Sequence, residues 1–117
     1  SCHVEKFTTG NHSDYDNLNQ QTIYPYSDFL LHDMGEGLGD NLPEYLASGN
    51  EWRTTPLWGL GLTETVSGRE TYLHDGRARN LTEAILWHGG EANRSVTKFK
   101  KLNNIQINQL LKFLRSL

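Results

Sequence analysis

Apolar positions recur at helical spacing only in the last third of the chain. Three helices are predicted there, over residues 81–88, about 91–102 and about 105–117. Asn80, followed three residues later by Glu83, is typical of a capped helix start, and the pair Gly89-Gly90 is typical of a helix end. The apolar faces of these helices consist of Leu81, Ala84, Ile85 and His88, then of Ala92, Val96 and Phe99, and last of Ile107, Leu110, Leu111, Leu114 and Leu117.

The rest of the chain shows neither the helical nor the strand period clearly. Residues 11–27 are polar and rich in Asn and Gln, and residues 35–39 hold three glycines, which suit the interior of neither element. Residues 43–47 could form a single helical turn that begins with Pro43. No strand of useful length stands out. We therefore predict a mostly α fold with long glycine-rich loops and little or no β structure.

The composition indicates a small core of side chains. The chain has 117 residues, which is the size of one domain or of one piece of a longer protein. Hydrophobic residues make up 36% of the chain, which is a low share. A large apolar cofactor in the interior, or a partner domain packed against a loop-rich domain, would each compensate for this deficit.

Charge and hydropathy argue against two classes of function. The net charge is -3, and the one basic cluster, at residues 98–101, is short, so we do not expect the chain to bind nucleic acid. The longest apolar run, at residues 29–31, is far too short to cross a membrane. The chain begins at Ser1 without a methionine, which predicts a processed or trimmed N-terminus.

The first residues, Ser1-Cys2-His3, match the end of a haem-attachment motif. Covalent haem c requires C-x-x-C-H, in which the thiols add to the vinyl groups and the histidine reaches the iron. The first cysteine would lie before Ser1, outside the chain, so only one thioether could form here. A chain made without haem-maturation machinery is expected to hold no haem. A surface cysteine near a terminus is the alternative interpretation of the same residues.

Two more histidines stand close to glycines. His74 lies just before a predicted turn, and His88 lies on the apolar face of a predicted helix, directly before Gly89-Gly90. A histidine on an apolar face is usually a core residue with satisfied hydrogen bonds, but a neutral imidazole is also a good iron ligand. The two glycines would let a flat macrocycle approach the backbone, which favours the ligand interpretation without deciding it.

Together these segments resemble the di-haem cytochrome c peroxidases and the related quinone-cofactor-maturing enzymes. In that superfamily an aromatic-His-Asp/Asn-Gly segment leads into a Leu-x-Glu-Ala/Val helix, as residues 72–84 do here. The distal ligand of the C-terminal haem stands fourteen residues after that histidine, which is position 88 in this sequence. The sequence resembles a subgroup of di-haem thiol oxidoreductases more closely still. This resemblance lies in residues 30–35, 51–54, 57–61, 73–79, 84–92 and 113–117.

The resemblance implies a cytochrome c-like haem domain over residues 1–117, the C-terminal part of a protein whose N-terminal haem domain lies outside the chain. Cys2 would hold the haem c, with His3 as the proximal and His88 as the distal iron ligand. Met34, the one methionine, lies in the glycine-rich loop and is the rival distal ligand. Two imidazoles would give a six-coordinate iron that suits electron transfer and leaves no position open for peroxide.

The resemblance also implies a location and partners. Haem c is attached only after export, so the periplasm is expected, with the N-terminal haem domain and a small redox protein as partners. Peroxidase or thiol-oxidising activity would belong to the whole protein, and this piece alone is not expected to turn over. Arg69 and Thr71 stand where the peroxidases have the Thr and Pro of an interdomain calcium site, which puts calcium in doubt.

Several other residues are lesser candidates for contact with the haem. Three arginines could pair with haem propionates or form surface salt bridges, namely Arg53, Arg77 and Arg79. Three tryptophans could pack in the core or against the porphyrin, namely Trp52, Trp58 and Trp87. In the superfamily, His74 lies near the haem edge as a hydrogen-bonding group. His12 and the pair His32-Asp33 look structural or exposed.

Two other functions remain open at this point. His32-Asp33, His74-Asp75 and His88 offer enough imidazoles and carboxylates for a non-haem zinc or iron hydrolase, although their spacing matches no metal motif. The chain could also be an interaction module without chemistry. That last hypothesis predicts that Cys2, His3 and His88 lie far apart.

Overall fold

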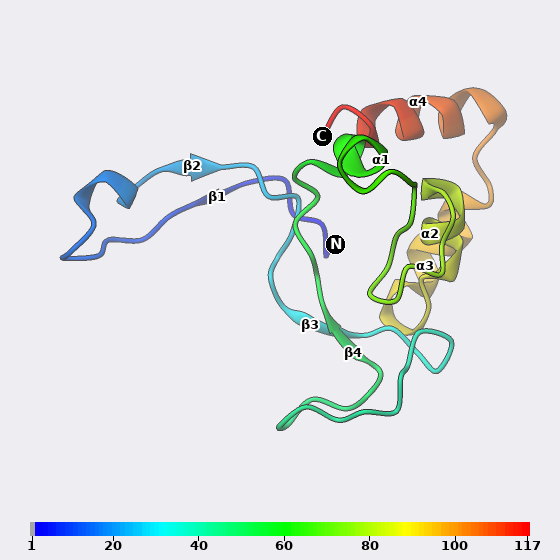
Figure 1. Cartoon of the computed structure of the whole chain (residues 1–117), viewed down its shortest axis with the longest axis horizontal. Helices are drawn as coiled ribbons and strands as arrows, with labels where there is room; N and C mark the ends of the chain where they lie inside the picture. Colours follow the sequence, from blue (N-terminus) through cyan, green and yellow to red (C-terminus); the bar gives the residue numbers. More distant parts are fainter. Residues whose placement is uncertain (1) are drawn as a thin grey trace.

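Two short antiparallel hairpins lie on the N-terminal side of four helices in the computed structural model, which describes residues 2–117 (Figure 1). Strand β1 (Phe7–Thr8) pairs with β2 (Thr22–Ile23), and this hairpin projects away from the rest of the chain. Strand β3 (Leu31–Asp33) pairs with β4 (Glu51–Arg53), with His32 opposite Trp52.

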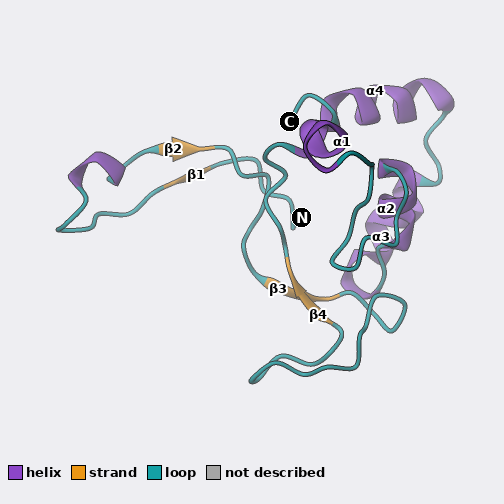
Figure 2. Ribbon diagram, viewed as in Figure 1, coloured by secondary structure: helices purple, strands orange, loops and turns teal. Residues whose placement is uncertain are grey.

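The helices form one side of the molecule (Figure 2). They are α1 (Thr63–Ser67), α2 (Leu81–Trp87), α3 (Asn93–Phe99) and α4 (Asn104–Leu114), and short 3-10 turns occur at Asp16–Leu18, Leu60–Leu62 and Gly90–Ala92. Asn80 caps α2 as predicted, because its side chain accepts a hydrogen bond from the backbone N–H of Glu83. A full capping box, which the sequence pattern did not reveal, starts α4 at Asn103 and Gln106.

The prediction of a mostly α fold with little or no β structure was wrong. The chain is 34% helical and 12% strand, with two small antiparallel sheets. Each strand is only two or three residues long, so period-two alternation cannot develop within it. The helical turn expected at residues 43–47 is absent as well, because Glu44 and Ala47 form an isolated antiparallel bridge instead.

The core is small, and much apolar surface stays exposed. Within residues 2–117 the buried hydrophobic side chains are Leu38, Ala78, Leu81, Ala84, Val96 and Phe99. The accessible surface is 8481 Å², whereas a compact chain of this mass exposes about 6,500 Å². The radius of gyration is 15.9 Å, against about 13 Å for a compact domain of this length. Exposed apolar residues are therefore available to a cofactor or a partner.

Chain connections hold the hairpins and helices together despite this small core. The carbonyl of Leu117 accepts a hydrogen bond from the N–H of Gly59 at 2.9 Å, which returns the C-terminus to the loop before α1. Among the described residues, no helix is long and apolar enough to cross a membrane.

Candidate functional site

The N-terminal segment lies against residues 26–28, and this contact positions His3. The N–H of Asp28 donates to the carbonyl of Cys2 at 2.8 Å, and the N–H of Ser27 donates to the carbonyl of Val4 at 2.9 Å. Tyr26 has a φ of 51°, which turns the chain at this point. Its carbonyl accepts a hydrogen bond from Nδ1 of His3 at 2.8 Å. The histidine ring is therefore fixed from behind by the backbone.

His88 is fixed in the same way at the end of α2. It is the C-cap residue of that helix, one position beyond the end of the helix and not within it as the sequence predicted. Its Nδ1 donates to the carbonyl of Ala84 at 2.7 Å. The ring of His88 lies across from that of His3, with ring centroids 6.5 Å apart and ring planes at 54°. The structure thus brings together two histidines that are far apart in the sequence.

The hydrogen bonds of the two rings determine which nitrogen is free. A carbonyl oxygen can only accept, so Nδ1 is the donor in both His3 and His88, and Nε2 is the nitrogen left for a metal in the neutral form of each ring. Two metal–nitrogen bonds of about 2 Å each, with the ring radii added, separate the centroids of two opposed imidazole ligands by about 6 Å. The observed centroid separation of 6.5 Å is close to this value.

The electrostatic surroundings also suit a ligand at His3. Desolvation is the largest cause that lowers the pKa of His3, and repulsion from His88 lowers it further, although the hydrogen bond to the Tyr26 carbonyl acts in the opposite direction. A lowered pKa keeps the imidazole neutral at pH 7. The neutral form is the one that binds a metal.

Met34 and the two glycines after His88 lie on the same side of the site. A Cβ on Gly89 would stand 2.7 Å from the carbonyl oxygen of Met34, and a Cβ on Gly90 would stand 2.7 Å from the N–H nitrogen of Gly35. The absence of side chains at 89 and 90 therefore lets the backbone of residues 33–35 pack closely. The backbone of residues 33–35 thus occupies the space beside the two glycines.

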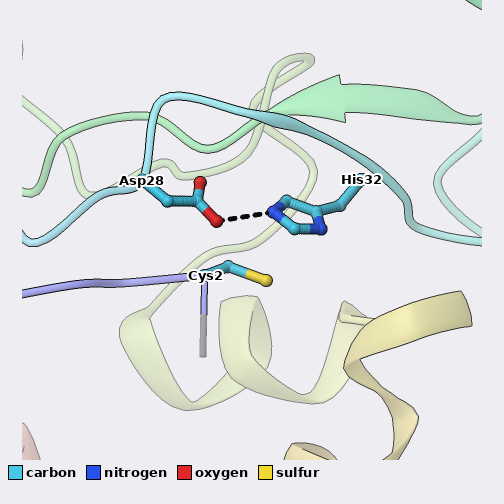
Figure 3. Close-up of side chains that lie close together, drawn as sticks. All are labelled: Cys2, Asp28 and His32. Carbon is cyan, nitrogen blue, oxygen red and sulfur yellow. Dashed lines mark hydrogen bonds and ion pairs between the residues drawn. The ribbon is translucent and has the colours of Figure 1, made fainter.

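A second group of polar side chains lies beside the His3 segment (Figure 3). Asp28 Oδ2 accepts a hydrogen bond from Nε2 of His32 at 2.8 Å, and the Cys2 side chain lies beside this pair. Glu91 Oε2 accepts from Nδ1 of His32 at 2.9 Å, and Glu91 Oε1 accepts from the N–H of Asp33 at 3.0 Å. We call Asp28, His32 and Glu91 the carboxylate–histidine bridge.

The bridge shifts the pKa of each of its members. The hydrogen bond to Glu91 is the largest cause that raises the pKa of His32, followed by the bond to Asp28. Desolvation raises the pKa of Asp28, but hydrogen bonds from the Leu30 N–H and from His32 outweigh it and lower the pKa to about 2. The bond from His32 lowers the pKa of Glu91. His32 is therefore a charged imidazolium between two carboxylates at mildly acidic pH.

These shifts predict how the bridge responds to pH. Because the folded pKa of His32 is raised, its contribution to stability is present below its unfolded pKa of about 6.5 and is lost as the pH rises through the folded value. Because the folded pKa of Asp28 is lowered, its contribution is present above about 3.9 and is lost as the pH falls toward 2. Cys2 is a further ionisable group beside His32, with its ligand atom within 4.8 Å, and His32 also acts on the pKa of His3.

We therefore expect His32→Gln to destabilise the protein most at about pH 5 and less at about pH 9. Urea denaturation of the wild type and the variant at both pH values measures this difference. His12→Gln, which removes an exposed imidazole in the distant hairpin, is the control. An equal loss of stability at both pH values would contradict the ion-pair interpretation.

The structure does not assemble the non-haem metal site. Among the described residues, the grouping with metal-ligand geometry is Cys2, Asp28 and His32, whose ligand atoms lie within 4.8 Å of one another. Both nitrogens of His32 already contact carboxylates, so a metal there would have to displace a charge-assisted hydrogen bond. His74 takes no part, because it stacks on Trp52 with centroids 3.7 Å apart and planes at 12°.

The arginines and tryptophans that were proposed to contact a haem differ in their exposure and in their partners. Arg77 is held within the protein, because its Nε contacts Asp75 at 2.5 Å and its guanidinium lies 5.0 Å from the centroid of Trp87. Arg53 is exposed on β4, and Arg79 pairs with Glu83.

Trp58 and Trp87 are exposed and lie outside the core. Within residues 2–117 the indole N–H of Trp52 is buried without a hydrogen-bond partner.

Sequence reasoning missed the bridge and the role of the Tyr26 carbonyl. His32 was expected to be structural or exposed, and Asp28 and Glu91 were not singled out. Asp28 and His32 are four residues apart, but they lie in a loop and a strand, where that spacing has no fixed meaning. The contact with Glu91 spans 59 residues, so it arises only from the tertiary fold.

A family model described as di-haem oxidoreductase, putative peroxidase, matches residues 1–117. No curated protein and no solved structure matches the chain.

Proposed function

The chain belongs to the di-haem oxidoreductase family, and from this we propose that it carries haem c and transfers electrons within a larger enzyme. The observation that carries the proposal is the pair of opposed histidines, His3 and His88, with centroids 6.5 Å apart. Both keep Nε2 free, and both are held by a backbone carbonyl. A hydrogen bond from the ring nitrogen that does not bind the metal orients a histidine ligand and makes its other nitrogen a better electron-pair donor.

In this proposal His3 and His88 would bind the haem iron, and the Cys2 thiol would add to a vinyl group of the haem to form a thioether. A bound haem c supplies a one-electron couple between ferric and ferrous iron. With both His3 and His88 bound to the iron, these two histidines would keep water and peroxide from it. The exposed Arg53 is a donor that would suit a propionate. Met34 remains the competing distal ligand.

The proposal extends to the rest of the protein. Because both axial positions would be filled here, reaction with an oxidant would belong to a second haem in an N-terminal domain. The accessible surface of the chain is larger than that of a compact isolated domain of this mass, and it includes many large apolar side chains. Both features support contact with such a domain. Covalent haem attachment requires export, so we place the protein in the periplasm, with a small redox protein as the electron partner.

A spectrum of the full-length protein tests the proposal. We expect the protein produced with haem-maturation machinery to contain two c-type haems per chain by the pyridine haemochrome assay. One of them should be low-spin in both the optical and the electron paramagnetic resonance spectrum, as two imidazole ligands require. Protein that matures without haem, or that contains only high-spin haem, would refute the proposal.

A further inference from the structure

We propose that His32 is a positioning residue that sets the spacing between His3 and His88 by joining the two segments that carry them. This inference rests on the proposed function, because the spacing matters only if the two histidines share a metal. His32 itself belongs to neither segment. It lies on β3, and its two ring nitrogens point to carboxylates on either side.

The first half of the bridge ends at the segment of His3. Nε2 of His32 donates to Asp28 at 2.8 Å, and the backbone N–H of the same Asp28 donates to the carbonyl of Cys2 at 2.8 Å. Cys2 precedes His3 directly, and the carbonyl of Tyr26 that holds the His3 ring lies two residues before Asp28. A shift of Asp28 would therefore move both backbone contacts that position His3.

The second half ends at the segment of His88. Nδ1 of His32 donates to Glu91 at 2.9 Å, and Glu91 also accepts from the N–H of Asp33 at 3.0 Å. Glu91 follows His88 by three residues, with Gly89 and Gly90 packed against the backbone of residues 33–35. The carboxylate thus fixes the end of α2 and the loop after it to β3.

A histidine suits this role better than other polar residues. Its rigid ring donates in two directions at once when it is protonated, and both of its bonds are then charge-assisted. The side chains of His32 and Asp28 are only 16% and 12% exposed, so water competes little for the bond between them. Gln at this position would keep some polarity, but it could not bridge two carboxylates with the same geometry or charge.

The test uses the full-length holoprotein with the substitution His32→Gln and, as a matched control, His12→Gln. We expect His32→Gln to keep both covalent haems, but to broaden the low-spin resonance signal of the bis-histidine haem and to convert part of it to high-spin. The affinity of that haem for cyanide should rise by about tenfold, because a looser distal ligand competes less well. His12→Gln should match the wild type in each measurement.

Each result decides between the two hypotheses. If the wild type shows a bis-histidine haem and His32→Gln changes neither the low-spin signal nor cyanide affinity by more than about twofold, the positioning role is wrong and the proposed function stands. If the wild type has no bis-histidine haem, the proposed function itself fails. Should His32→Gln not mature, Glu91→Ala removes only one half of the bridge and is expected to show the same change. A wild-type spectrum for Glu91→Ala would overturn the inference.

Discussion

Replacement of His88 by Ala is expected to convert one haem of the full-length protein from low-spin to high-spin while both haems remain covalently attached. Nε2 of His88 is the free nitrogen of a ring that α2 and the Ala84 carbonyl hold 6.5 Å from His3. The nearby imidazole of His32 has both ring nitrogens bonded to carboxylates, and His74 is stacked on Trp52, so neither replaces the ring of His88. The iron would therefore lose its sixth ligand.

Cyanide binding measures the same change quantitatively. A tethered ligand competes with a free one at an effective concentration of mM or more, so its removal should tighten cyanide binding by at least about 100-fold. Added imidazole should restore the low-spin spectrum, because it fills the space that the ring leaves. The measurements are optical titration and electron paramagnetic resonance at low temperature.

Met34→Leu is the matched control for this prediction, because it tests the rival distal ligand. If His88 is the ligand, Met34→Leu should keep the low-spin spectrum and His88→Ala should lose it. The reverse pattern would assign the distal position to Met34 and reject the pairing of His3 with His88. His74→Ala should leave the iron spectrum unchanged, because the ring of His74 packs on Trp52 and is not expected to bind the iron.

The two halves of the candidate site differ in how far the sequence could predict them. Cys2 and His3 stand in a motif whose spacing follows from the chemistry of haem attachment, and resemblance to a family singled out His88. The carbonyls of Tyr26 and Ala84, which fix the rings, carry no side-chain signal at all. The bridge through His32 depends on a contact across 59 residues, which no local pattern encodes.

Three of the four helices in the described residues were predictable, whereas α1 and the strands were not. Helices form at the three predicted places because apolar spacing and a capping residue are local signals, as at Asn80. The hairpin of β3 and β4 depends on pairing between Leu31 and Arg53 and between Asp33 and Glu51, across a loop without regular structure. Loop-closing contacts of this kind are set by the whole chain, which is why the expected fold with little or no β structure failed.

Substitution of Gly90 by Ala is expected to be the most destabilising single change near the site. Gly90 has a φ of 49°, a conformation that costs a residue with a side chain about 1–2 kcal/mol. A Cβ there would also stand 2.7 Å from the Gly35 nitrogen and would contact the Asp33 carbonyl even more closely. Both neighbours are backbone atoms, so they cannot move aside without opening the contact between β3 and the end of α2.

We therefore expect Gly90→Ala to lower the free energy of unfolding by about 3 kcal/mol, from backbone strain and overpacking together. Gly37→Ala is the matched control, because a Cβ at Gly37 meets nothing within 4 Å, and it should change stability by no more than about 0.5 kcal/mol. Urea denaturation of both variants measures the difference. If the two glycine variants are equally stable, the close packing of residues 33–35 on Gly89-Gly90 does not hold the loops together. If Gly90→Ala is the less stable, the same packing also limits how far His88 can move from His3, because His88 lies two residues before the strained position.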